Sequence, residues 1–126
     1  MTNLVEKELS YKIIGILFDV YNNLGGGYQE KYYQRAIAKE LKNRNIKFKE
    51  QVFVPLKFKE DSIGRYFLDF IIEDRIILEI KVGNKFYNRD IKQVLGYLKA
   101  ANIPLGILVN LNRNNLQFKR ILKGKN

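Results

Sequence analysis

A chain of 126 residues, 46% of them hydrophobic, is long enough for one folded domain, which we expect to span residues 1–126, and too short for two. It contains no cysteine and no histidine, which excludes disulfides, thiolate catalysis, serine–histidine triads and zinc sites built from these residues. The 23 lysines and arginines outnumber the 13 acidic residues, and the net charge of +10 favours a polyanionic partner such as nucleic acid, although a lysine-rich genome would give the same excess.

Two helices are predicted in the first third of the chain. Residues 4–24 carry apolar side chains at three- and four-residue spacing, which is typical of a helix with an apolar stripe, and the glycines at 25–27 end it. A second helix is expected over residues 28–44, with Tyr33 and Leu41 on its apolar face.

Strands fill most of the remaining chain, with one helix among them. The strands are expected at residues 52–58, 65–72, 75–82, 104–111 and 116–122, and the helix at residues 87–102. Pro55 predicts that the first strand lies near a sheet edge, and Asn88 is the expected N-cap of the helix. We expect the buried face of this helix to hold Ile91, Val94, Leu95 and Leu98.

The order α-α-β-β-β-α-β-β predicts an α/β fold with a mixed sheet of about five strands flanked by helices. The helix between the third and fourth strands favours a right-handed parallel crossover. No apolar run approaches the ~20 residues of a membrane span. The first ten residues, MTNLVEKELS, lack the basic and then apolar order of a signal peptide, so we expect a cytoplasmic protein without a membrane partner.

Charged residues interrupt two strands that otherwise resemble buried core. Glu79 and Lys81 lie within RIILEIKV and share one face, and Asp69 interrupts YFLDFII. If Ile72 pairs with Ile76 across a three-residue loop, Asp69 lies beside Glu79. With a two-residue loop the two carboxylates would point to opposite faces, and the sequence leaves both registers open.

Adjacent carboxylates repel each other unless a cation lies between them. Mg²⁺ is typically held by one or two carboxylates with waters and phosphate oxygens, and Lys81 beside it would hold a water or a phosphate oxygen. This layout suits hydrolysis of a phosphodiester. An Asp–Lys–Glu ion-pair network on a half-exposed sheet face accounts for the same residues equally well.

Asp69 followed by Glu79-Ile80-Lys81 on the next strand resembles the PD-(D/E)XK nuclease superfamily. The restriction-endonuclease-like core of that superfamily, αβββαβ, matches the predicted order from the second helix onward and leaves the first as an extra N-terminal helix. The motif is relaxed here, because Leu68 stands where proline is usual.

A second resemblance lies in GYQEKYY. Gly27, Glu30 and Tyr33 fit the pattern that names the GxxExxY protein family, a small single-domain branch of the same superfamily. The resemblance covers about residues 8–122.

The resemblance implies roles for particular residues. Asp69 and Glu79 would be ligands of Mg²⁺ or Mn²⁺, together with the backbone carbonyl of Ile80, and Lys81 would orient the attacking water. Glu30 would join the catalytic metal site from its helix, although an ordinary solvated glutamate near a helix N-terminus is the alternative.

Four further residues are candidates for binding the substrate. Gln93 and Tyr97, four apart on one helix face, resemble the QxxxY motif of exonuclease-type members and would hydrogen-bond the site or the substrate. The alternative is a polar helix flank with Tyr97 packed in the core. Lys85 and Arg89 would contact phosphates, or else form a solvated basic face.

The resemblance thus implies a metal-dependent nuclease with DNA as the expected substrate. The alternatives are a non-catalytic nucleic-acid-binding module, and a homodimer or subunit that works only within a larger assembly. A glycosidase fits less well, because tryptophan is absent and the charge is basic. With little surface for reading base sequence, we expect recognition of shape or strand ends.

Overall fold

A computed structural model describes residues 5–124, and its elements follow the predicted order. They are α1 (Lys7–Leu24), α2 (Glu30–Asn43), β1 (Phe48–Phe58), β2 (Asp61–Ile72), β3 (Ile76–Lys81), α3 (Asn88–Ala101), β4 (Leu105–Leu111) and β5 (Leu116–Leu122). Residue 4, the predicted start of the first helix, lies outside the described residues.

The five strands form one mixed sheet in the order β1-β2-β3-β4-β5. β3 and β4 pair in parallel and are joined through α3, whereas the other neighbours are antiparallel. β1 is an edge strand, as Pro55 predicts, since proline has no N–H to donate to a further strand. The predicted mixed sheet flanked by helices is therefore confirmed.

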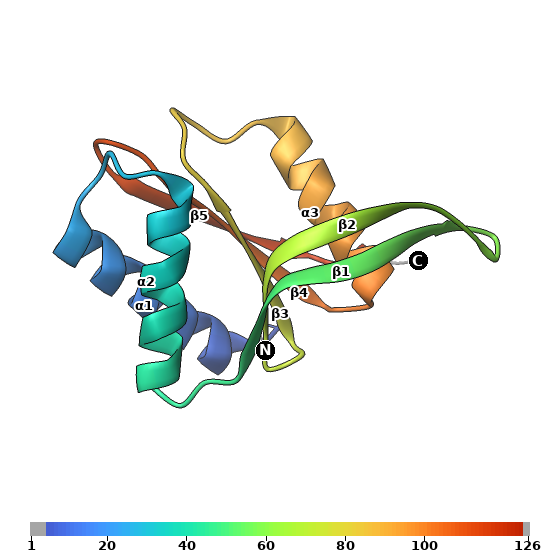
Figure 1. Ribbon diagram of the computed structural model, residues 1–126, viewed down its shortest axis with the longest axis horizontal. Coiled ribbons are helices and arrows are strands. Elements are labelled where there is room, and N and C mark those ends of the chain that lie inside the picture. Colours follow the sequence, from blue (N-terminus) through green and yellow to red (C-terminus); the bar gives the residue numbers. More distant parts are fainter. Residues whose placement is uncertain (1–4, 125–126) are drawn as a thin grey trace, which may run out of the picture.

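Helices cover both faces of the sheet, with α1 and α2 on one side and α3 on the other (Figure 1). The stripe of α1 and the Tyr33–Leu41 face of α2 pack against alternate residues of β3, including Leu78. On the opposite face α3 packs Val94 and Leu98 against Ile77 of the same strand. Both sides of β3 are thus covered, so Glu79 within it has little access to water, whereas Lys81 at its end is partly exposed. None of the helices within residues 5–124 combines the length and hydropathy that a membrane crossing requires.

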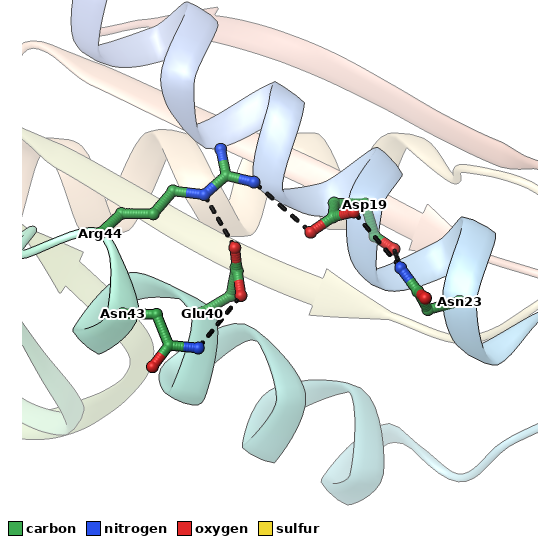
Figure 2. Close-up of polar contacts among 5 residues, drawn as sticks. All are labelled: Asp19, Asn23, Glu40, Asn43 and Arg44. Atoms are coloured by element: carbon green, nitrogen blue, oxygen red, sulfur yellow. Dashed lines mark hydrogen bonds and ion pairs between the residues drawn. The ribbon is translucent and has the colours of Figure 1, made fainter.

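A polar network fixes α2 against α1 (Figure 2). Arg44, just after α2, donates from Nε to Glu40 Oε2 at 2.8 Å and from Nη2 to Asp19 Oδ2 on α1 at 3.4 Å. Asn23 and Asn43 add hydrogen bonds to Asp19 and Glu40. These side chains are partly exposed, so each ion pair contributes only ~0–1 kcal/mol. The network orients α2, whose first residue is Glu30.

Two expectations for α3 are wrong. Asn88 is the first residue of the helix rather than its cap; Tyr87 is the N-cap, and its N–H donates to Asp90 Oδ2 at 3.1 Å. Leu95, expected on the buried face, is 37% exposed, whereas Tyr97 is buried on that face. The stripe that faces the sheet runs through positions three and four apart, 94, 97 and 98, which turns residue 95 toward solvent.

The β1–β2 hairpin is longer than predicted. β1 begins four residues earlier than expected and β2 also begins four residues earlier, so the two strands are joined by a tight turn at Lys59 and Glu60. The outer part of this hairpin projects beyond the helices (Figure 1). The residues that the prediction missed, 48–51 and 61–64, are mostly exposed and do not alternate between apolar and polar, so no strand pattern marks them in the sequence.

Candidate active site

The β2–β3 hairpin has the register that brings Asp69 and Glu79 together. Ile72 pairs with Ile76 across the three-residue loop Glu73–Arg75, which is one of the two registers that the sequence leaves open. The ladder between β2 and β3 ends one pair before Asp69 and Glu79. These two residues are therefore the first to face each other where the strands separate.

Both carboxylates lie in the fork between β2 and β3. Asp69 donates its backbone N–H to Glu79 Oε1 at 3.2 Å, and Ile80 donates its N–H to Asp69 Oδ2 at 2.9 Å. Each side chain thus bonds to the backbone of the opposite strand, in place of the ladder bonds that end here. Asp69 is 8% exposed and Glu79 is 5% exposed, so the fork is nearly dry.

Asp69 also lies at a gap in the ladder on its other side, opposite Gln51 of β1. The neighbours of Gln51 pair with β2 in an unchanged register, but Gln51 itself has a left-handed φ of 47° and is left out of the ladder. Its side-chain amide donates to Gln34 Oε1 on α2 at 3.2 Å and to Asp69 Oδ1 at 3.5 Å. Gln51 therefore links α2 to the carboxylate fork. Sequence reasoning missed both glutamines, because no motif or periodicity marks an unpaired position within a strand.

The fork disfavours negative charge. Burial, and then the charge of Asp69, raise the pKa of Glu79 to about 8. Burial also raises the pKa of Asp69, against the opposing effects of the Ile80 N–H, the Gln51 amide and the charge of Lys81. A cation placed between the carboxylates would reverse both effects.

Lys81 follows Glu79 on the same face of β3 and is held by α3. Its Nζ donates to Gln93 Oε1 at 3.2 Å. Across residues 5–124, no ion pair within 4.0 Å joins Lys81 to Asp69 or Glu79. Its charge nonetheless lowers the pKa of both carboxyls, so it lies beside them without neutralising either. The salt-bridge network that would explain these charges by structure alone is not formed.

Glu30 approaches the fork from the other helix layer. It is the first residue of α2 and is half-buried. Burial, and next the charge of Asp69, raise its pKa, while the charge of Lys81 lowers it. Glu30 therefore shares the electric field of the cluster and is not the freely solvated helix residue of the alternative interpretation.

The loop before α2 is fixed by Tyr33. Its hydroxyl donates to the Gly25 carbonyl at 2.7 Å and accepts from the Tyr28 N–H at 3.3 Å. Gly27 adopts a φ of 94°, a conformation that residues with a Cβ rarely adopt. The spacing of Gly27, Glu30 and Tyr33 thus has a physical basis: the glycine turns the chain, the tyrosine holds the loop, and the glutamate starts the helix.

Tyr97 fits both of its interpretations. Its ring is 4% exposed and packs edge-on against Tyr66, with centroids 4.8 Å apart, as a core residue would. Burial, followed by the charges of Glu79 and Asp69, raises its pKa, which places the phenol in the field of the fork. The hydroxyl therefore remains a hydrogen-bond donor at neutral pH.

Lys85 and Arg89 lie outside this cluster. Both are exposed, and both lie against the ring of Tyr87, with Lys85 Nζ 5.5 Å and Arg89 Cζ 4.6 Å from its centroid. They surround the start of α3 rather than the carboxylates. Their contact with phosphates stays a prediction.

The donor set of the fork fits a hard divalent cation. Glu79 Oε2 has no hydrogen-bond partner within residues 5–124, and no fully buried side-chain oxygen or nitrogen there lacks one, so this oxygen reaches solvent. It lies beside a second carboxylate, and oxygen ligands suit Mg²⁺. Within the described part of the chain, no three acidic side chains converge closely enough to hold an ion together, so the ligand roles of Glu30 and of the Ile80 carbonyl stay predictions.

Comparison with known proteins gives a family and solved structures of similar fold. A model of the PD-(D/E)XK nuclease superfamily matches residues 7–121. The crystal structure of SSO0001 superposes with a TM-score of 0.61 at 19% identity, over 76% of this chain and 50% of that one. An alkaline exonuclease from Laribacter hongkongensis, LHK-Exo, superposes with a TM-score of 0.58 at 12% identity, over 98% of this chain and 73% of that one. The chain thus spans half the length of SSO0001, and no curated protein sequence matches it.

Proposed function

Because the chain belongs to the PD-(D/E)XK nuclease superfamily, we propose that it is a metal-dependent nuclease that hydrolyses phosphodiester bonds in DNA. The observation that carries this proposal is the fork between β2 and β3. Two buried carboxylates face each other there, each fixed by a backbone N–H, beside a lysine that is not ion-paired with either. A salt bridge would neutralise such charges, whereas a hydrolytic site needs them available.

The proposed cofactor is Mg²⁺ or Mn²⁺. Asp69 and Glu79 would hold the ion, with the Ile80 carbonyl and Glu30 as further ligands. Bound there, the ion supplies Lewis-acid stabilisation of the negative charge that develops on the phosphate. The oxygen of Glu79 that reaches solvent and the raised pKa values of the fork support this assignment, since both reflect carboxylates that gain from a nearby cation.

Lys81 would orient the attacking water. Its ammonium donates hydrogen bonds only, so it holds the water oxygen and favours the negative charge that forms as a proton leaves. Gln93 fixes the direction of Lys81 through the 3.2 Å hydrogen bond, which makes Gln93 a positioning residue. Tyr97 would donate from its hydroxyl to a substrate oxygen.

We further assign the chain to the GxxExxY branch. The support is local: the left-handed Gly27, the Tyr33 hydroxyl bonded to the loop, and Glu30 as the first residue of α2 together direct one carboxyl toward the fork. We also propose that residues 1–126 act as a single cytoplasmic domain. A homodimer is the alternative that light scattering would reveal.

Incubating the purified protein with plasmid, linear duplex DNA, single-stranded DNA and RNA tests the proposal, in Mg²⁺, Mn²⁺ or EDTA. We expect cleavage of DNA in Mg²⁺ or Mn²⁺ and none in EDTA. Glu79→Gln is the matched control for a contaminating nuclease, because it preserves size but removes the charge. Equal cleavage by both proteins, or no cleavage of any substrate, overturns the proposal.

The second candidate is a nucleic-acid-binding module without catalysis. The net charge of +10 supports it as well as it supports a nuclease. A module that touches ~5 phosphates binds duplex DNA with a log–log salt slope of about −4 to −5. Such a slope without cleavage in any metal would select this candidate, and absence of both would select a subunit of a larger assembly.

A further inference from the structure

An exposed tyrosine near the start of α2 is surrounded by cations. The side chain of Tyr32 is 44% exposed. Lys31 Nζ lies 5.2 Å from its ring centroid and Arg35 Cζ lies 5.6 Å from it. The Tyr32 cluster, meaning these three residues, follows directly on Glu30.

The same arrangement occurs at the start of α3. Tyr87 is 40% exposed, and Lys85 and Arg89 both lie close to its ring at the distances given above. Its backbone is fixed as the N-cap of α3 by the hydrogen bond to Asp90. These residues form the Tyr87 cluster.

The helix turns that carry the two clusters lie at the end of the sheet where the carboxylate fork opens (Figure 1). In Figure 1, the first turn of α2 and the first turn of α3 lie at the same end of the molecule, on the two sides of the sheet. Tyr32 comes two residues after Glu30. Tyr87 precedes Gln93, the partner of Lys81, by six residues, which is about 9 Å along a helix. The two helices whose first turns carry the clusters therefore each bring one polar side chain to the fork, Glu30 from α2 and Gln93 from α3.

We propose that the two clusters grip a single strand of nucleic acid across the fork. Each tyrosine ring would stack on an unpaired base, and the lysine and arginine beside it would contact the adjacent phosphates. This inference rests on the proposed function for the placement of the scissile phosphate, and it adds the class of substrate: a single strand, or a duplex end whose strands have separated.

The chemistry of the clusters favours a single strand over a duplex. Base faces are stacked on one another within a duplex, so an exposed aromatic ring reaches them only where bases are unpaired. Contacts between cations and exposed rings are weak, so the lysines and arginines can exchange the ring for a phosphate at little cost. Their charge complements the strand backbone.

The proposed grip is tested by measuring the binding of labelled oligonucleotides in EDTA, which prevents metal-dependent cleavage of the probes. The probes are a single-stranded DNA, an RNA of the same sequence and the blunt DNA duplex, followed by fluorescence anisotropy. We expect Tyr32→Ala and Tyr87→Ala each to weaken single-strand binding about 10-fold, and duplex binding less than about 2-fold. Tyr32→Phe and Tyr87→Phe should bind like wild type, because stacking does not use the hydroxyl. The DNA and RNA arms identify which single strand is preferred.

Tyr11→Ala is the matched control. Tyr11 is 80% exposed and lies near the start of α1, at the opposite end of the sheet, where Glu6 pairs with Arg75 of the β2–β3 loop. This variant should bind every probe like wild type. If the Tyr32→Ala/Tyr87→Ala double variant binds the single strand as tightly as wild type, or loses single strand and duplex equally, the grip is contradicted.

The outcome separates this inference from the nuclease proposal. Tyrosine-dependent single-strand binding without metal-dependent cleavage supports the grip and overturns the nuclease. Metal-dependent cleavage with single-strand binding unchanged in the double variant supports the nuclease and overturns the grip. Arg35→Gln and Arg89→Gln provide a second readout, since each should reduce the log–log salt slope on single strands by about 0.7.

Discussion

The two faces of β3 differ in what they contact. On one face Leu78 and Ile80 are buried in the apolar core formed with α1 and α2. On the other, Ile77 packs against α3, but the next two positions along that face are Glu79 and Lys81. One strand thus carries fully buried apolar residues on one face and charged residues on the other.

The difference shows how the fold tolerates a charged fork. Burying a carboxylate is unfavourable, and the raised pKa of Glu79 reflects that cost. The apolar face is complete without Glu79, so the sheet holds the carboxylates in place even though they do not stabilise it. We therefore expect changes on the apolar face to affect stability, and changes on the charged face to affect activity.

The largest expected effect is that of Lys81→Ala on cleavage. Loss of the group that orients the water should reduce the cleavage rate by about 10²–10⁴-fold. Because Lys81 forms no ion pair with the carboxylates, its removal should leave the melting temperature in Mn²⁺ close to that of wild type. A variant that melts much lower and gains nothing from metal would mean that the lysine stabilises the fork as a counter-ion.

On the apolar face of β3, Leu78→Ala should lower the stability of the fold. Truncating a fully buried leucine costs about 2–5 kcal/mol of unfolding free energy, which urea denaturation would measure. Leu95→Ala is the matched control, because the partly exposed Leu95 should cost less than about 1 kcal/mol. If the two changes cost the same, the apolar face is not what holds β3.

On the charged face of β3, the pH dependence of stability tests whether burial of Glu79 is unfavourable when this residue is ionised. Since the folded state raises the pKa of Glu79 from 4.5 to about 8, the folded protein binds this proton more tightly than the unfolded chain. The resulting stability is fully present below pH ~4.5 and is lost as the pH rises through ~8, an effect on the order of 5 kcal/mol. Unfolding in EDTA across this range should show the loss in wild type and not in Glu79→Gln. Identical pH slopes would contradict it.

The smallest expected effect concerns the left-handed backbone of Gln51. Glycine adopts a left-handed φ without strain, so Gln51→Gly should be more stable than Gln51→Ala by about 1 kcal/mol, although both lose the same amide. At Glu50, which pairs regularly with β2, the order should reverse. Thermal unfolding of the four variants checks this, and the same order at both positions would mean that the break beside Asp69 is not present.

Much of the fork could be predicted from sequence. The order of elements follows from apolar periodicity, which depends on local spacing and is displayed directly in a sequence. The sequence leaves the register of the β2–β3 hairpin open between two alternatives, and the structure has the one in which Ile72 pairs with Ile76 and Asp69 lies beside Glu79. The roles of these residues in catalysis remain predictions.

Other features depend on contacts between distant segments. Gln34 and Gln51, 17 residues apart in the chain, come together where Gln51 leaves the β1–β2 ladder, a position that no sequence signal marks. Leu95 is exposed and Tyr97 is buried because the side of α3 that faces the sheet runs through residues 94, 97 and 98, and the apolar residues of a short helix do not fix which side that is. The polar character of a residue shows neither which segment it meets nor where a strand bends.

Calorimetric titration of Mn²⁺ tests the central claim most directly, at pH ~8.5, where Glu79 is ionised in the folded protein. If the fork is a cation site, wild type binds the ion, and Lys81→Ala binds it equally or more tightly because a like charge has been removed. Glu79→Gln should bind at least about 10-fold more weakly. Equal binding by wild type and Glu79→Gln, or no binding by wild type, would contradict the account that these buried charges are present to hold a metal ion.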